Sequence, residues 1–191
     1  MVYLIGVAHR VQYTNDKSDP GEIMRFSAFL EMKALKLKIT CIAEELNAEV
    51  LREKKATACT ALAVTRKLNI EHRFCEPDRS EREALGIPSE RIHTKAPVGD
   101  GDSRKDIGER IRKEREKYFE LRERFWIDRI EDKIDEPIFF ICGADHVGSF
   151  GTLLSEKGYD VEVLIEDWTE PNRQAPLAFL QYRGRGSLNE Y

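Results

Sequence analysis

The stretch 138–146, Ile-Phe-Phe-Ile-Cys-Gly-Ala-Asp-His, decides the fold that we expect for this chain. It is a continuous apolar run that stops at a glycine and delivers a histidine three residues later. The N-terminal stretch 2–9, Val-Tyr-Leu-Ile-Gly-Val-Ala-His, repeats the Gly-x-x-His ending. Short apolar runs bounded by turn residues are typical of strands that are buried on both faces of a parallel sheet. We therefore expect two buried strands that each end in Gly-x-x-His.

Three further strands and four helices alternate with these two runs. The strands are expected at about 39–45, 69–78 and 161–165, and the helices at about 22–38, 47–68, 104–134 and 147–158. Strands that alternate with helices predict an α/β fold: a three-layer, mostly parallel sheet with helices on both faces. Numbered along the chain, the strands are expected in the order of about 3-2-1-4-5. In that order the two Gly-x-x-His strands are neighbours.

The length and composition favour one domain in a reducing compartment. The 191 residues suit a single α/β domain at 1–168, with a long charged helix at about 104–134, and a C-terminal tail at 169–191. The net charge of −4 offers no basic field, so neither nucleic acid nor a membrane is an expected partner. The sequence has no apolar stretch of membrane-spanning length and no signal-peptide pattern, and its four cysteines lack Cys-x-x-Cys spacing. These features predict a cytoplasmic protein with reduced thiols.

The candidate site lies where the two Gly-x-x-His strands end. Ligands of open parallel sheets bind outside the carboxyl ends of the strands, so His9 and His146 are expected to share one crevice. A single histidine after a strand is more often an ordinary loop residue, but two at neighbouring strand ends favour a function. Glu44 and Glu45 end the adjacent strand. Because side chains alternate along a strand, one should enter the crevice while the other faces a helix or solvent. We assign the crevice to Glu45.

Two kinds of chemistry fit these residues, and their spacing does not decide between them. His9, Glu45 and His146 form the mixed set that a divalent metal such as Mn, Co or Zn takes, with positions left for water. The same residues can act without a metal, one histidine as the general base and the carboxylate orienting it. Gly6 and Gly143 are the positions where the backbone would come close to a bound cofactor.

Two further features have both a functional and a structural interpretation. Arg124 lies on the long helix before the strand at 138–143, where it can serve as an anion or oxyanion partner. On the pattern of the helix alone, ion pairs within an amphipathic helix are the better explanation of this arginine. The glycine-rich turn at 143–151 opens a helix, a place that attracts phosphate, but it matches no established nucleotide-binding motif.

Taken in order, these motifs resemble a known family. Gly-Val-Ala-His9 follows the first strand, Ile-Ala-Glu-Glu45 the second, Glu-Arg124-Phe lies on a late helix, and Gly-Ala-Asp-His146 follows a buried strand. This series is similar to the TraB/PrgY proteins and to the wider superfamily of Tiki proteases, erythromycin esterases and haem-binding ChaN proteins. The resemblance extends over most of the chain, from about residue 2 to 165.

The resemblance implies a catalytic set of His9, Glu45, Arg124 and His146. In several branches it also implies hydrolysis of an amide or ester, sometimes with a metal. The two histidines and Glu45 would activate water for attack on a carbonyl of a small molecule or peptide, and Arg124 would stabilise the developing anion. The alternative is a non-catalytic protein that binds a metal, haem or nucleotide in the same crevice. The charged first half of the helix at 104–134 offers a surface for a homodimer.

Overall fold

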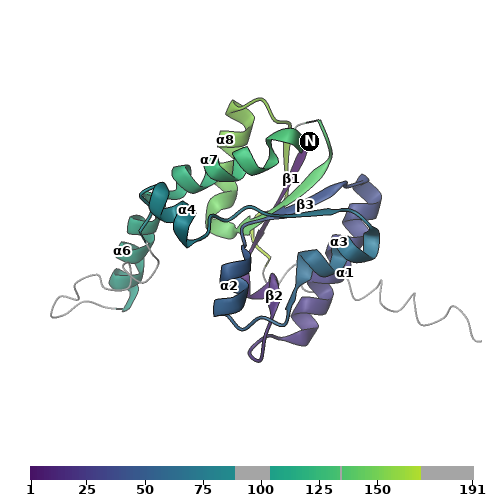
Figure 1. The fold of residues 1–191 in the computed structure, drawn as a ribbon, viewed down its shortest axis with the longest axis horizontal. Coiled ribbons are helices and arrows are strands. Elements are labelled where there is room, and N and C mark those ends of the chain that lie inside the picture. The colour runs from purple at the N-terminus through teal and green to yellow at the C-terminus, as the bar shows by residue number, and fades with distance from the viewer. Residues whose placement is uncertain (89–103, 134, 169–191) are drawn as a thin grey trace, which may run out of the picture.

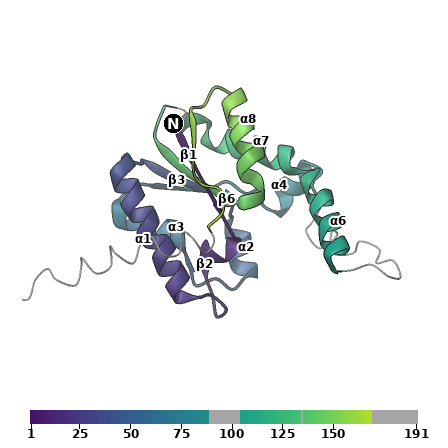
Figure 2. The same ribbon diagram turned by 180° about the vertical axis from the view of Figure 1, so that it is seen from behind.

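The computed structural model describes residues 1–88, 104–133 and 135–168, and a five-stranded parallel sheet forms its centre (Figure 1). In the order of the sheet, the strands are β5 (Glu71–Phe74), β3 (Cys41–Glu44), β6 (Ile138–Gly143), β1 (Val2–Val7) and β7 (Val161–Ile165). Helices cover both faces, as the two views in Figures 1 and 2 show. The expected three-layer α/β fold is therefore confirmed.

The expected order of the strands is wrong at the centre of the sheet. β6 lies between β3 and β1, and β1 pairs with β7. Both central strands are apolar and almost fully buried, so their patterns do not reveal which of them neighbours β3. The two still pair with each other in parallel, with Gly6 opposite Cys142 and Val7 opposite Gly143. Their Gly-x-x-His ends consequently lie level at one edge of the sheet.

Each face of the sheet has its own apolar core. One face packs against α1 (Pro20–Leu37) and α3 (Thr60–Leu68), and the other packs against α7 (Phe119–Ile130) and α8 (Val147–Glu156). The alternation within β3 follows this division. Ile42 joins the first core, whereas Cys41 and Ala43 join the second.

Local signals at both ends define the first helix. Asp19 caps α1 by accepting a hydrogen bond from the backbone N–H of Gly21, and Pro20 occupies the first helical position. Lys38 ends the helix in the left-handed conformation, with a φ of 54°. The chain then enters β3 directly.

The helix expected at 47–68 is two helices. α2 (Ala48–Glu53) is capped by the side chain of Asn47, and α3 begins after the short strand β4 (Ala58–Cys59). Lys55 separates them, because its φ of 51° does not belong to a right-handed helix. β4 pairs in antiparallel with β2 (Tyr13–Thr14), which anchors the loop that follows β1.

The long helix expected at 104–134 is also divided. α6 (Arg104–Glu116) ends two residues before α7, and Tyr118 between them has a φ of −109° and a ψ of 4°. The break falls where the charged sequence ends and the aromatic sequence begins, and α7 contributes Trp126, Ile127 and Ile130 to the core on its face of the sheet. In both views α6 lies far from α1 and α3, beyond the short helix α4 (Arg79–Ala84).

Three short 3-10 helices complete the described structure: η1 (His9–Val11), η2 (Glu131–Lys133) and η3 (Ala144–His146). The loop expected around 94–103 and the tail at 169–191 lie outside the described residues. Within 1–88, 104–133 and 135–168, no helix combines the length and apolar character that a membrane span requires.

Candidate functional site

The carboxyl ends of β1, β3 and β6 bring His9, Glu45 and His146 together. The Nε2 atoms of the two imidazoles each lie 3.7 Å from the same carboxylate oxygen, Oε1 of Glu45. The backbone N–H of Glu45 donates to the carbonyl of Ile141 over 2.8 Å, which holds the end of β3 against β6. Glu44 points elsewhere, as the alternation of the strand predicts. The three residues that the sequence placed in one crevice are thus neighbours in space.

Glu45 is a buried anion at the centre of this group. Its Oε2 accepts a hydrogen bond of 2.6 Å from the backbone N–H of Gly143, and its Oε1 pairs with the guanidinium of Arg122. Burial alone would raise the pKa of the carboxyl. Arg122, the two histidines and the Gly143 N–H outweigh burial and lower the pKa from 4.5 to about 2.

This shift predicts how acid affects the stability of the protein. The unfolded chain takes up the Glu45 proton at higher pH than the folded chain does, so the stabilisation is complete above about pH 4.5 and is lost toward pH 2. The loss should be on the order of 3 kcal/mol. Urea unfolding of the wild type and of Glu45→Gln across this range measures it. We expect a flatter pH dependence in Glu45→Gln and an unchanged one in the exposed control Glu120→Gln. Parallel curves for all three proteins would contradict the assignment.

His9 presents an unprotonated nitrogen toward Glu45. Its Nδ1 lies 2.7 Å from Oε1 of Gln12, and the Nε2 of Gln12 donates to Oε2 of Glu44 over 3.1 Å. Because an amide oxygen only accepts, the proton of the neutral imidazole is on Nδ1. The lone pair on Nε2 is then free. The His9 side chain is 52% exposed, so solvent and ligands can reach this nitrogen.

His146 is held in the same tautomer but is buried. Its Nδ1 donates to Oε1 of Glu123 over 2.8 Å, and its Nε2 accepts from Nη1 of Arg122 at 3.0 Å. The ring of Phe119 lies over the imidazole with the centroids 3.7 Å apart, and Trp126 contacts it from its edge. Both nitrogens therefore have partners, so His146 is fixed in position and is far less accessible than His9.

Arg122, and not Arg124, is the arginine of the site. The guanidinium of Arg122 pairs with Glu45 and, over 2.7 Å, with Oε2 of Glu76. Arg124 is exposed and pairs with Glu120 four residues earlier on its own helix. The assignment of Arg124 to the site is therefore wrong. Residues two apart on a helix point in nearly opposite directions, so only one of the two arginines can face the sheet.

The arrangement does not fit a divalent metal on His9, Glu45 and His146. Arg122 uses the one lone pair on Nε2 of His146 and also pairs with Oε1 of Glu45, and its positive charge would repel a second cation. A metal on these three residues would require the guanidinium to move away. We therefore derive no chemistry from a metal at this position.

The two glycines that were expected to approach a cofactor have different roles. A Cβ on Gly6 would lie 1.9 Å from the carbonyl oxygen of Glu166, so the chain after β7 fills that space and no ligand can. The cofactor role of Gly6 is therefore wrong. A Cβ on Gly143 would lie 3.3 Å from Oε2 of Glu45 and 3.4 Å from Nε2 of His9. Gly143 borders the site, but its N–H is committed to Glu45.

Three alanine substitutions test these glycine environments. Gly6→Ala should cost about 3 kcal/mol or more, because its new methyl group meets backbone atoms. Gly143→Ala should cost about 1 kcal/mol, since its neighbours are side chains that can yield slightly. Gly148→Ala is the matched control: nothing lies within 4 Å of its Cβ, so it should stabilise α8 by about 0.4–1 kcal/mol. Chemical unfolding measures the change in the free energy of unfolding for each variant. Equal changes for Gly6→Ala and Gly148→Ala would contradict the packing described for these glycines.

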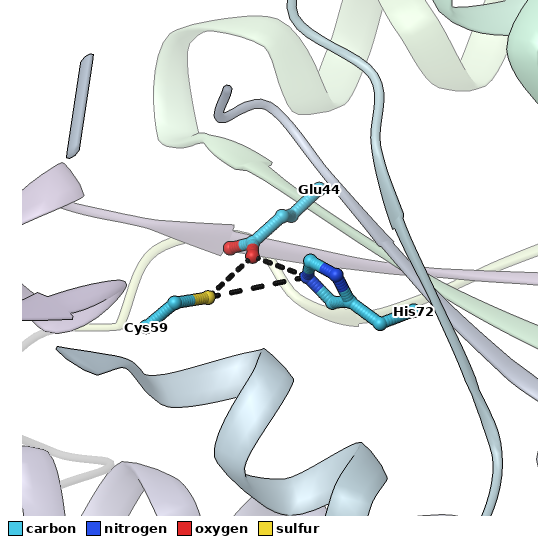
Figure 3. Close-up of side chains that lie close together, drawn as sticks. All are labelled: Glu44, Cys59 and His72. Atoms are coloured by element: carbon cyan, nitrogen blue, oxygen red, sulfur yellow. Dashed lines mark hydrogen bonds and ion pairs between the residues drawn. The ribbon is translucent and has the colours of Figure 1, made fainter. Parts of the chain in front are cut away.

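A second polar cluster lies beneath His9 and was missed from the sequence. The side chains of Glu44, Cys59 and His72 point toward one another in Figure 3, from β3, β4 and β5. Oε1 of Glu44 accepts from Sγ of Cys59 over 2.9 Å and from Nε2 of His72 over 2.7 Å. Gln12 connects this carboxylate to His9. Burial, and then the charge of Glu44, raise the pKa of the Cys59 thiol.

Part of this second cluster has a signal in the sequence. His72 lies opposite Ile42 in the pairing of β5 with β3. Ile42 and Glu44 are two residues apart on β3 and face the same side, so Glu44 and His72 lie on one face of the sheet. Glu76, which follows β5, gives no such signal for its pairing with Arg122. Cys59 resembles any buried cysteine in the sequence.

Comparisons with known proteins add no further identification. No protein-family model, no curated protein and no solved structure matches this chain. Its function must therefore be argued from the geometry of the site.

Proposed function

We propose that this protein is a hydrolase that activates water for attack on an amide or ester carbonyl at the carboxyl edge of its sheet. The observation that carries the proposal is Nε2 of His9, which belongs to a half-exposed side chain, is unprotonated in the neutral ring, and lies 3.7 Å from the buried anion of Glu45. A general base needs such a lone pair within hydrogen-bond reach of its substrate. The chain of contacts from His9 through Gln12 to Glu44 keeps the ring in this orientation.

In the proposed reaction, His9 acts first as the general base and then as the general acid. A water that lies about 2.8 Å from both Nε2 of His9 and Oε1 of Glu45 fits the separation of these two atoms. His9 takes one proton as the water oxygen forms a bond to the carbonyl carbon. The proton then passes to the leaving nitrogen or oxygen as its bond to that carbon breaks. Glu45 stabilises the imidazolium that exists between these steps.

The remaining residues position the reacting groups and balance their charges. Arg122 keeps Glu45 ionised, and in this proposal its positive charge also stabilises the negative charge that develops on the carbonyl oxygen, the role that was expected for Arg124. His146 and Glu123 hold Arg122 in place through the bond from its Nη1. His146 is therefore a positioning residue in this proposal, in contrast to the catalytic role expected from the sequence.

The proposed substrate is polar, such as a small molecule or peptide, and the support for this is a cavity that reaches Glu76 but is not lined by His9 or Glu45. The cavity has a volume of about 640 Å³, lies between α2 and α4, and includes Glu76, the partner of Arg122, in its wall. Carboxylates and guanidinium groups both line it, among them Glu49 and Arg129. This mixed lining suits a molecule with hydrogen-bonding and charged groups. The resemblance to the TraB/PrgY proteins supports the same reaction class, and membership of that superfamily remains part of the proposal.

The proposal also includes a location and a partner. A cytoplasmic location is supported by the four cysteines at 41, 59, 75 and 142, which are all free thiols. A homodimer through α6 is supported by the charged, largely exposed surface of residues 109–117. Sedimentation of the purified protein tests the dimer, and a strict monomer at all concentrations removes it.

Turnover measurements test the function. Wild type, His9→Ala and His146→Ala are assayed on a panel of esters, peptides and lactones, each with a chelator and with added Mn, Co or Zn. We expect wild-type turnover that survives the chelator and falls in both variants. Equal rates for the three proteins would refute the hydrolase. A different result supports the non-catalytic alternative: no substrate is turned over, and the purified protein shows haem absorption in the visible or nucleotide absorption in the ultraviolet. The binding protein then replaces the hydrolase as the proposed function.

A further inference from the structure

The cluster of Glu44, Cys59 and His72 contains three different metal-binding groups. A carboxylate, a thiol and an imidazole meet with their ligand atoms within 4.8 Å of one another. The separations are 2.9 Å from sulfur to oxygen, 2.7 Å from nitrogen to oxygen and 3.9 Å from sulfur to nitrogen. Glu44 is fully buried, and the side chain of His72 is only 8% exposed. Three such side chains do not gather in a core for packing alone, since each loses its hydration there.

We propose that Glu44, Cys59 and His72 bind one divalent transition-metal ion of the Zn²⁺ type. Sulfur and nitrogen ligands favour Zn²⁺ and exclude Mg²⁺ and Ca²⁺, which take oxygen ligands. The site shares no ligand with the group around Glu45, to which Gln12 connects it, and the proposal does not rest on the proposed hydrolase.

The geometry needs little adjustment to hold the ion. Tetrahedral zinc with one sulfur, one nitrogen and one oxygen ligand has ligand-to-ligand distances of about 3.4–3.6 Å. Two of the present separations are shorter than this and one is longer, so changes of less than about 1 Å suffice. Oε2 of Glu44 is held by Gln12, which leaves Oε1 to face the ion. This is the kind of outer contact that orients a metal ligand.

The charges also balance. Binding displaces the proton of the Cys59 thiol to solvent as the sulfur–metal bond forms, and His72 binds through Nε2 with its proton moved to Nδ1. The thiolate and the Glu44 carboxylate then carry two negative charges against the two positive charges of the ion. A neutral sum is what a buried site requires.

One of the three ligands borders a cavity, and the set leaves a fourth position for water. A cavity of about 260 Å³ between α2 and α3 reaches Cys59, with Leu51 and Leu62 in its wall. Three protein ligands leave one tetrahedral position open.

Titration of the metal-stripped, full-length protein with Zn²⁺ and Co²⁺ tests the proposal. We expect one metal ion to bind tightly to each chain. With Co²⁺ we also expect a thiolate-to-cobalt charge-transfer band in the near ultraviolet. Cys59→Ala and His72→Gln should each weaken binding about a hundredfold or more, since outer contacts alone are worth ten- to a hundredfold. Cys41→Ala is the matched control, because it removes a buried sulfur from the opposite core. It should leave the band unchanged, as should His9→Ala.

Folding controls and a second variant make each result of the titration interpretable. Circular dichroism first establishes that each variant is folded. If Cys59→Ala does not fold, the Co²⁺ spectrum of the wild type and the affinity of His72→Gln still give the answer. Absence of Zn²⁺ binding by the wild type overturns the proposal and leaves Glu44 as a hydrogen-bonded carboxylate only. A band that survives the loss of Cys59, or that disappears with Cys41 or His9, overturns it as well.

Discussion

Arg122→Ala should reduce the free energy of unfolding by about 3–5 kcal/mol, the usual cost of removing one partner from a buried ion pair. The substitution leaves the buried carboxylate of Glu45 without its arginine, takes from Glu76 one of its two arginine partners, and removes the donor to Nε2 of His146. The Arg122 side chain is only 13% exposed, so water cannot replace these contacts.

Arg124→Ala is the matched control for this prediction. It lies two residues away on the same helix, and its side chain is 49% exposed in a pair with Glu120. An exposed pair of this kind contributes about 0.2–1 kcal/mol at most. Urea unfolding of the two variants measures the difference directly. If they are equally stable, Arg122 does not hold the site together and our account of Glu45 fails with it.

His9→Ala should lower kcat/KM by about 10²–10⁴-fold on any substrate that the panel identifies, the usual contribution of a general base. Stability should change less than activity, because the His9 side chain is half exposed. The substitution leaves an open space beside Glu45. Added imidazole should enter this space and restore part of the activity.

Gln12→Leu is the control for this rescue. Gln12 fixes the tautomer of His9 from a buried position, so its loss should reduce kcat by about 10–100-fold, as for other orienting contacts. Imidazole should not rescue Gln12→Leu, because His9 still occupies its own place. Rescue of both variants, or of neither, would argue against His9 as the base.

Much of the fold could be predicted because its signals are local. The apolar runs at 2–8 and 138–143 give buried strands, and the Asp19–Pro20 start gives α1. The strand order depends on whether β1 or β6 lies next to β3. Both strands are apolar along their length, so the sequence pattern does not distinguish them. The division of the helix at 47–68 depends on tertiary pairing, that of β4 with β2.

The site could be predicted where it follows from the topology of the sheet. Residues that follow parallel strands share an edge whatever the order of the strands, and this places His9, Glu45 and His146 together. Arg122 was missed because two arginines flank Glu123 and only the rotation of the helix separates them. A usable signal exists, since Arg122 precedes the buried Trp126 by four residues and so shares its face.

Side-chain ¹⁵N NMR of the histidines tests the central claim most directly, namely that His9 presents a bare Nε2 to the ionised Glu45. Spectra recorded where the imidazoles are neutral distinguish the two tautomers, and His9→Gln assigns the signals of His9. We predict that His9 carries its proton on Nδ1, as the bond to Gln12 requires. A proton on Nε2 of His9 would contradict the account, because that nitrogen could not then take a proton from water.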